Sequence, residues 1–280
     1  MNRADKLEYL KKRIADKGKL LVAYSGGVDS SLLARMANDI LGGGALAVIL
    51  DSMAMPRCEL LSARELAASL GLNYRVAEFT ILKDEQFCHN PVTRCYICKK
   101  KSAAVLKSIA KEEGISCIAD GVNLNDYGDY RPGIAAYNEE GIWHPFVDAA
   151  ITKEDIRTLA HSLGLTVWNK PSAACLASRI PYGQTITPES LRMVEEAEEY
   201  LKSLGFLQLR VRSHGRTARI ELLKRDMARS MNCSDEIAKR LKVIGFDYVS
   251  LDLEGFRSGS MDEGLVKEVS MKEVLWTSRK

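Results

Sequence analysis

A run of apolar residues that ends in a glycine turn constrains the fold of this chain more than any other feature. The run is Leu20–Tyr24, and Ser25, Gly26 and Gly27 follow it directly. From Ser31 to Leu41 apolar residues recur at helical spacing, and three glycines then precede a second apolar run, Ala45–Leu50. Short apolar runs bounded by glycine turns predict buried strands. The chain is therefore predicted to begin its fold with a β-α-β unit.

The same alternation continues to about residue 170. Helical spacing is present at 58–70, 99–113 and 153–163, and short strand-like segments lie at 74–79, 115–119 and 165–168. Strands that alternate with helices pair in parallel, and the helices cover both faces of the sheet. The predicted fold class is α/β, a parallel sheet with helices on both faces.

The pattern changes after Pro188. A helix is predicted at 188–204, strands at 207–213, 218–222 and 248–253, and a second helix from Cys233. These elements describe a small α+β domain, and 280 residues are enough for one large domain and one smaller one. We predict an α/β domain at 1–170, a junction at 171–187 that carries Cys175, and a C-terminal α+β domain at 188–280.

Charge and composition narrow the class of protein. The formal net charge is +3, which is too small a surplus to indicate a nucleic-acid partner. No apolar stretch is long enough to cross a bilayer, and the charged N-terminal residues do not form a secretion signal. The seven cysteines therefore do not indicate a disulfide framework. We expect a soluble cytoplasmic protein without a membrane or nucleic-acid partner.

The glycine turn has the composition of a phosphate-binding loop. Two glycines let the backbone approach an anion, and the helix that follows presents N–H groups and its positive end. No Lys follows the glycines, so this is not the G-x-x-x-x-G-K-[ST] loop of kinases and GTPases. Its residues are Ser25, Gly26, Gly27, Val28, Asp29, Ser30 and Ser31. The serines are expected to donate hydroxyl groups, and Asp29 to orient the loop or hold a metal. A plain Ser/Gly-rich turn is the alternative.

The pattern S-G-G-x-D-S is similar to the loop of the N-type ATP pyrophosphatases, the PP-loop superfamily. These Rossmann-like enzymes cleave ATP between the α and β phosphates and release pyrophosphate. The resemblance implies an ATP site in the first domain, with Asp51 and Ser52 beside the adenine or ribose. Gly121 follows another predicted strand, and ligands gather at the carboxyl ends of parallel strands.

Three cysteines stand out by their positions. Cys95 and Cys98 form a C-x-x-C at the start of a predicted helix, and Cys175 lies in a stretch of small residues in the junction. Three thiolates can hold three irons of a [4Fe-4S] cluster and leave the fourth iron open. The alternatives are ordinary thiols or half of a zinc site for the pair, and a buried small hydrophobe for Cys175. The remaining cysteines are expected to pack in the fold: Cys58, Cys88, Cys117 and Cys233.

Six segments carry a second resemblance: 25–31, 94–99, 129–133, 174–183, 210–215 and 255–259. In this order they are similar to the LarE family, ATP-dependent sulfurtransferases that act in nickel-pincer cofactor synthesis for lactate racemase. The resemblance implies ATP, Mg²⁺, a homo-oligomer, and pyridinium-3,5-biscarboxylic acid mononucleotide as the substrate. Its members take sulfur either from one sacrificed cysteine, here Cys175, or from a [4Fe-4S] cluster on three cysteines. The presence of Cys95 and Cys98 points to the cluster type.

Basic residues near the junction fit a phosphorylated substrate. Arg210 and Arg212 alternate along a predicted strand and so project to one face, and guanidinium groups suit phosphate. By resemblance Arg257 joins them and Glu198 binds Mg²⁺, while Arg179 is expected to favour the Cys175 thiolate. A solvated charged face is the alternative for the arginines, and a wet helix face for Glu198.

The chemistry explains the use of ATP. Adenylation turns the oxygen of a carboxylate into part of a leaving group, so that sulfur can attack the acyl carbon and form a thiocarboxylate. The competing hypotheses are another PP-loop enzyme, such as a tRNA thiolase or an amidotransferase-type synthetase, and a nucleotide-binding iron-sulfur sensor without turnover. A tRNA thiolase would carry a strongly basic surface, and an amidotransferase a glutaminase domain; neither is apparent.

Overall fold

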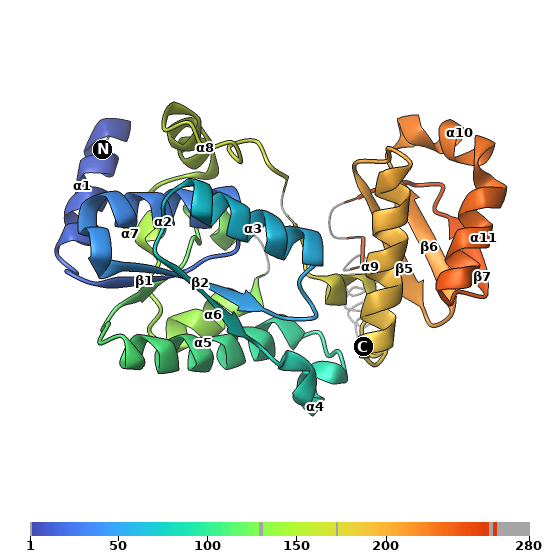
Figure 1. Ribbon diagram of the computed structural model, residues 1–280, viewed down its shortest axis with the longest axis horizontal. Helices are drawn as coiled ribbons and strands as arrows, with labels where there is room; N and C mark the ends of the chain where they lie inside the picture. The colour runs from blue at the N-terminus through green and yellow to red at the C-terminus, as the bar shows by residue number, and fades with distance from the viewer. Residues whose placement is uncertain (1, 129–130, 172, 258–259, 262–280) are drawn as a thin grey trace, which may run out of the picture. The chain divides into compact units, whose positions relative to one another are not determined.

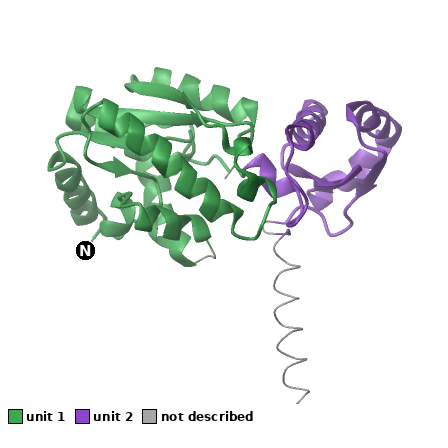
Figure 2. Cartoon of the chain, turned by 90° about the horizontal axis from the view of Figure 1, so that it is seen from below, with its two compact units in different colours: residues 1–174 green, residues 175–280 purple. Residues whose placement is uncertain are grey.

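The chain forms two compact units, residues 1–174 and residues 175–280, and each is described by itself (Figure 2). The computed structural model describes residues 2–128, 131–171, 173–257 and 260–261. Parts of three predicted segments lie outside these ranges: residues 129–130 and 258–259 of the family motifs, and Ser172 of the junction. The end of the predicted C-terminal domain, residues 262–280, also lies outside them.

The first unit is built on a parallel sheet of four strands in the order β3-β2-β1-β4 (Figure 1). Its strands are β1 (Leu20–Ala23), β2 (Ala45–Asp51), β3 (Tyr74–Glu78) and β4 (Ile118–Ala119). In the centre, Leu21 of β1 is paired with Leu46 on one side and with Ile118 on the other. The two central strands come from the most apolar runs of the sequence, as burial on both faces requires.

Helices cover both faces of this sheet (Figure 1). One face packs on α1 (Arg3–Ala15), α2 (Val28–Leu41), α3 (Arg57–Ser69), α7 (Pro145–Asp148) and α8 (Lys153–Ser162). The other face packs on α5 (Arg94–Glu112) and α6 (Pro132–Glu139), while the short α4 (Glu85–Cys88) precedes α5. Side chains alternate between the two faces along β1, so Leu21 packs in the core with α5 and Val22 packs in the core with α2. The predicted α/β class is confirmed.

The second unit is a three-stranded sheet with helices on one face. The strands β5 (Leu209–His214) and β6 (Thr217–Leu222) form a hairpin, and β7 (Tyr248–Leu251) lies parallel to β6. The helices are α9 (Pro188–Ser203), α10 (Lys224–Asn232) and α11 (Ser234–Ile244). Val211 and Ile220 face the core with Leu241, whereas the alternate positions on the other face are charged. The small α+β region that the sequence predicts is present.

Three predicted elements differ from the structure. Residues 165–168 form a turn, not a strand, because Leu165 and Val167 are buried in the core beside the helices, and that burial alone explains the apolar pattern. The predicted strand at 115–119 is reduced to the two residues of β4. The helix predicted from Lys99 begins at Arg94, so the C-x-x-C lies inside α5.

Candidate functional site

The phosphate loop joins the end of β1 to the start of α2. Gly26 has a φ of +73°, and a Cβ on it would stand 2.6 Å from the Cβ of Ala63 in α3, so only glycine fits. Inside the loop the hydroxyl groups of Ser25 and Ser30 are 3.1 Å apart, and Ser30 also donates to the carbonyl of Gly27. The loop is therefore fixed by its own bonds and by α3 before any anion binds.

The end of β4 closes against this loop. A Cβ on Gly121 would lie 2.8 Å from the backbone nitrogen of Ser30, so the chain after β4 approaches the first turn of α2 as closely as glycine permits. Two residues later Asn123 donates from its side-chain amide to Asp29 at 3.3 Å. Gly121 and the loop are thus neighbours at the carboxyl ends of the paired strands β1 and β4, and contact of Gly121 with ATP stays a prediction.

A lysine from a distant part of the chain completes this arrangement. Lys153, the first residue of α8, forms an ion pair with the carboxylate of Asp29. Thr152 caps α8 and Asp155 completes its capping box, so the start of this helix is fixed. The side chains of Lys153 and Asp29 are 30% and 24% exposed, so both remain accessible. Lys153 brings to the loop a cation that the loop itself does not contain.

Asp51 and Ser52 are held by an arginine at the start of α3. The Asp51 carboxylate accepts a hydrogen bond of 2.6 Å from Arg57, which also donates to the carbonyl groups of Ser52 and Met55. The Ser52 hydroxyl accepts from the backbone N–H of Ala54 at 3.2 Å. This turn is ordered at the carboxyl end of β2, and contact with the adenine or ribose stays a prediction.

A buried pair of aspartate and histidine lies directly after β4. Asp120 accepts at 2.6 Å from Nδ1 of His144, and both side chains are almost fully buried. Among the described residues, Nε2 of His144 is one of few buried side-chain nitrogens that make no hydrogen bond. No local sequence pattern connects these two residues, and the Asp-Gly step at 120–121 is the one local signal for the aspartate.

Cys95 and Cys98 lie in the first two turns of α5, one turn apart. Residues at i and i+3 share a helix face, so both sulfur atoms can approach one metal centre. Cys95 is exposed and Cys98 half-buried. Although burial acts to lower it, Tyr137, Asp120 and Cys98 raise the pKa of Lys99, which keeps a positive charge beside the pair. In the part of the chain that is described, no three His, Cys, Asp or Glu side chains form a metal site.

In the second unit, the segment after Cys175 is tied to α9. Arg179 donates from Nε and Nη2 to the two carboxylate oxygens of Glu198, at 2.9 and 3.0 Å. It also donates from Nη1 to the carbonyl oxygen of Cys175 at 3.0 Å. The carboxylate that was expected to bind Mg²⁺ is therefore engaged by a guanidinium group, and the arginine expected to favour a thiolate has its charge balanced by Glu198.

The three arginines that were predicted to bind phosphate differ in their partners. Arg212 donates to both oxygens of the fully buried Glu221, at 3.0 and 2.9 Å, and also to Ser260. Arg257 lies 2.9 Å from Glu254 and 3.8 Å from Asp252. These two guanidinium groups are held by acidic partners.

Arg210 is different. Its guanidinium lies over the ring of Phe256 at 5.2 Å and donates to the carbonyl of Leu209. Within the described ranges it forms no ion pair with an acidic side chain. Burial is the largest cause that lowers the pKa of Arg210 to about 10; the charges of Arg179 and Arg212 act in the same direction, and the carboxylates of Glu198 and Glu221 act against them. A dianionic phosphate would offset the cost of burying this positive charge.

Comparison with known proteins decides the family. The sequence model of the NAD synthase family matches residues 4–90, which include the phosphate loop. An uncharacterized protein of Synechocystis sp. is 39% identical over 264 residues, which cover 94% of this chain and 98% of that protein. The pyridinium-3,5-bisthiocarboxylic acid mononucleotide synthase of Lactiplantibacillus plantarum is 40% identical over 255 residues, 91% of this chain and 92% of that protein. The chain belongs to the LarE family. It is an ATP-dependent enzyme of the PP-loop class.

More distant similarity extends to other PP-loop enzymes. One subunit of the glutamine-hydrolyzing GMP synthase of Methanopyrus kandleri is 29% identical over 211 residues, which cover 68% of this LarE-family chain and 64% of that protein. Of the helices described in this family member, none is both long and apolar enough to span a bilayer.

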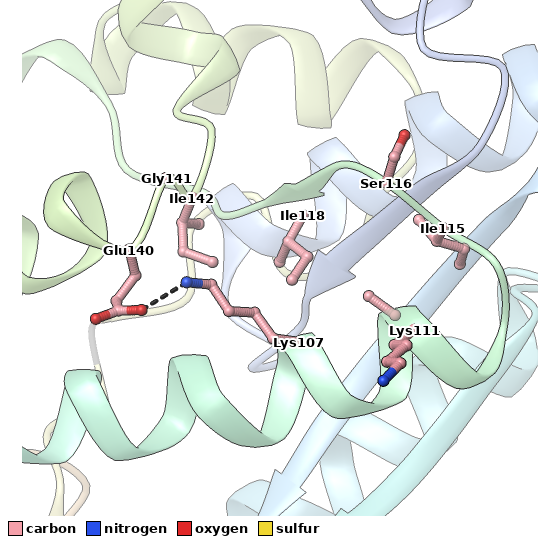
Figure 3. A pocket seen from close by; sticks show the side chains of 9 residues that line it. Lys107, Lys111, Ile115, Ser116, Ile118, Glu140, Gly141 and Ile142 are labelled. Carbon is pink, nitrogen blue, oxygen red and sulfur yellow. Dashed lines mark hydrogen bonds and ion pairs between the residues drawn. The ribbon is translucent and has the colours of Figure 1, made fainter.

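One cavity of the LarE-family enzyme lies away from the loop (Figure 3). It has a volume of about 360 Å³ and is lined by Lys107 and Lys111 of α5, by Glu140, and by a floor that includes Ile118. Lys107 points to Glu140 across its rim, at 2.5 Å. Ile115 and Ser116, which precede β4, also line it, whereas Gly121 follows that strand. The cavity therefore lies at the opposite end of β4 from the phosphate loop.

Proposed function

We propose that this enzyme converts a carboxylate of pyridinium-3,5-biscarboxylic acid mononucleotide into a thiocarboxylate, with an acyl adenylate as the activated intermediate and pyrophosphate as the leaving group. The observation that carries the proposal is the 40% identity, along 92% of its length, to a protein named pyridinium-3,5-bisthiocarboxylic acid mononucleotide synthase. The chemistry agrees with the name, because a thiocarboxylate is made from a carboxylate only after one oxygen becomes part of a good leaving group.

In this proposal, the adenylation step takes place at the phosphate loop. The N–H groups at the start of α2 and the serine hydroxyl groups bind the departing pyrophosphate. Lys153 leaves Asp29 and neutralises charge on the phosphates, which frees the Asp29 carboxylate to help hold Mg²⁺. Mg²⁺ is commonly bound by one or two carboxylates together with substrate phosphates, so a single Asp is a sufficient protein ligand. Asp51, Ser52 and Gly121 line the remaining part of the nucleotide site.

The phosphate of the mononucleotide binds at Arg210. Support comes from its position on the charged face of β5 and from the missing acidic partner among the described residues. Arg212 and Arg257 contribute to the same positive surface, but each is first held by a carboxylate. Arg210 is the guanidinium that gains most from a bound dianion.

For the source of sulfur we propose a [4Fe-4S] cluster, which Cys95, Cys98 and Cys175 would hold. When bound, such a cluster supplies an iron with an open position for an additional sulfur. The helical spacing of Cys95 and Cys98 fits two ligands of one centre, and the positive charge of Lys99 suits a group of thiolates. In the second route, Cys175 gives up its own sulfur and needs neither of the other two cysteines.

Anaerobic purification with iron and sulfide analysis tests the cluster route. We expect about four irons per chain in the wild type and their loss in Cys98→Ala. Iron-free protein after anaerobic reconstitution would leave the sacrifice of Cys175 as the sulfur source.

The reaction itself is tested by pyrophosphate release from ATP with and without the pyridinium dicarboxylate mononucleotide, together with the mass of the product. We expect substrate-dependent pyrophosphate and a product in which sulfur replaces oxygen. In Cys175→Ala, pyrophosphate release should continue in part while the thiocarboxylate disappears. Thiocarboxylate made by Cys175→Ala would exclude both sulfur routes, and ATP binding without pyrophosphate release would favour a sensor.

A further inference from the structure

The main chain of Cys175 is anchored by three hydrogen bonds to one atom. Its carbonyl oxygen accepts from the backbone N–H of Ser178 at 3.0 Å, from the Ser178 hydroxyl at 2.7 Å and from Nη1 of Arg179 at 3.0 Å. The first two are local bonds of the short helical turn that follows. The third comes from the guanidinium of Arg179. It therefore fixes the Cys175 carbonyl only as firmly as the partners of Arg179 fix that side chain.

One of these partners is Glu198 of α9, and another is the Ser178 hydroxyl, to which Nη1 of Arg179 donates at 3.0 Å. Arg179 and Glu198 meet in a bidentate pair, and their side chains are only 3% and 4% exposed. Glu198 also accepts, at 3.1 Å, from the backbone N–H of Val211 in β5. A continuous series of bonds therefore runs from β5 through α9 to the carbonyl of Cys175, within residues 175–280. Bidentate guanidinium-carboxylate pairs fix orientation as well as distance.

We propose that Glu198 is a positioning residue for sulfur transfer: it orients Arg179, which holds in place the main chain of Cys175 from which the sulfur-bearing side chain projects. The proposal rests on the proposed function, in which Cys175 takes part in sulfur transfer. It replaces the expected Mg²⁺ role of Glu198, because Arg179 and Val211 already use both carboxylate oxygens. Stability alone does not require a buried ion pair here, since apolar replacements of such pairs are often neutral.

The double variant Arg179→Met/Glu198→Leu tests the proposal without leaving a buried charge unpaired. Pyrophosphate and thiocarboxylate are measured in the same reaction. We expect the ratio of pyrophosphate to thiocarboxylate to rise at least about tenfold, because the acyl adenylate still forms but water intercepts it when the sulfur is misplaced. The matched control is Arg192→Met/Glu196→Leu, an exposed pair on the same helix, which should keep the wild-type ratio.

If the ratio of pyrophosphate to thiocarboxylate is unchanged in the double variant, the proposal is wrong. This holds whether pyrophosphate release and thiocarboxylate formation both stay at the wild-type rate or both decrease. Should the double variant not fold, Ser178→Ala removes the hydroxyl bond to the Cys175 carbonyl and the bond that Arg179 donates to that hydroxyl, and it should raise the same ratio by a smaller factor. Glu198→Gln adds a second test. The proposal expects a wild-type Mg²⁺ dependence of pyrophosphate release, and a large shift to higher Mg²⁺ would make Glu198 a metal ligand instead. A wild type that makes no thiocarboxylate at all refutes the proposed function itself.

Discussion

At the phosphate loop, Asp29 supplies a carboxylate and Lys153 supplies the cation that is paired with it. The loop supplies N–H groups, hydroxyl groups and one carboxylate, and the cation arrives from α8. A carboxylate next to a phosphate site would repel the nucleotide, so its pairing with Lys153 also removes an unfavourable charge. The pair is accessible enough for its partners to be exchanged when ATP binds.

Replacement of Lys153 by Met should therefore damage adenylation. It removes the cation from the phosphates and leaves Asp29 uncompensated, so we expect substrate-dependent pyrophosphate release to fall by about 100-fold. Steady-state pyrophosphate assays measure this. Lys12→Met, on the exposed side of α1, is the control and should have no effect. Wild-type rates in Lys153→Met would mean that Lys153 serves only to hold α8.

Arg210 should contribute to substrate binding more than to stability. Loss of one charge-assisted contact costs about 1.5–3 kcal/mol, so Arg210→Gln should raise the KM for the mononucleotide by about 10- to 100-fold. The melting temperature should hold or rise, because the cost of burying a positive charge is removed. Arg212→Gln should behave in the opposite way and lower the melting temperature, since it leaves Glu221 buried without its bidentate partner. Kinetics and thermal unfolding of both variants separate the two roles.

At the scale of elements, the start of α8 is a junction for several interactions. Asp155 completes the capping box of this helix and also binds α1, through Arg3 at 2.8 Å and Lys6 at 3.3 Å. One carboxylate thus fixes α8 to α1, and with it the helix that delivers Lys153 to the loop. Although burial acts to raise it, bonds from Arg3 and Thr152 lower the pKa of Asp155 to about 2.

This pKa predicts a pH-dependent contribution to stability. Because the pKa of Asp155 is lower in the folded state than its ordinary value of 3.8, the contribution is complete above 3.8 and is lost as the pH falls towards 2. The difference in melting temperature between wild type and Asp155→Asn should be largest near neutral pH and shrink below about pH 4. Asp39→Asn, at an exposed pair with Arg35, is the control and should change little at any pH.

Sequence patterns predicted elements well where local chemistry decides. The strands β1 and β2 follow from apolar runs, and the loop between β1 and α2 from its glycines. Residues 165–168 were predicted wrongly because an apolar run reports burial and not sheet pairing. Lys153 was missed because its partner Asp29 is 124 residues away and no local pattern connects them.

The arginines show a subtler limit. Alternation along β5 correctly predicts that Arg210 and Arg212 share a face, but not which of them is paired. That depends on β6, where Glu221 lies opposite Arg210 in register yet bonds diagonally to Arg212. Distinguishing a paired guanidinium from an available one requires the geometry of the hairpin and the bond between Arg212 and Ser260.

At the scale of the whole molecule, the chain contains separate hydrophobic cores. Those of the first unit lie on the two faces of its sheet, and the core of the second lies between its sheet and α9 and α11. The residues proposed to bind ATP all belong to the first unit, and those proposed to bind the substrate phosphate belong to the second. Units with their own cores can unfold independently.

Calorimetry of the full chain should therefore resolve two transitions. Leu241→Ala, a cavity in the core of the second unit, should lower one of them, since such changes cost about 2–5 kcal/mol. Leu106→Ala, fully buried in α5, should lower the other, and that same transition should rise when ATP binds. A single transition that both variants lower equally would mean that the units unfold together.

The contact between Gly26 and Ala63 has a consequence for anyone who searches genomes for this loop or grafts it into another scaffold. The loop is shaped against α3: a side chain at 26 would collide with Ala63, which is itself fully buried. A transplanted S-G-G-x-D-S would be forced out of shape by a bulky residue on the receiving helix. The structural motif is thus the loop together with a small residue nearly forty positions downstream. A motif search that requires both should return fewer chance matches than a search for the loop alone.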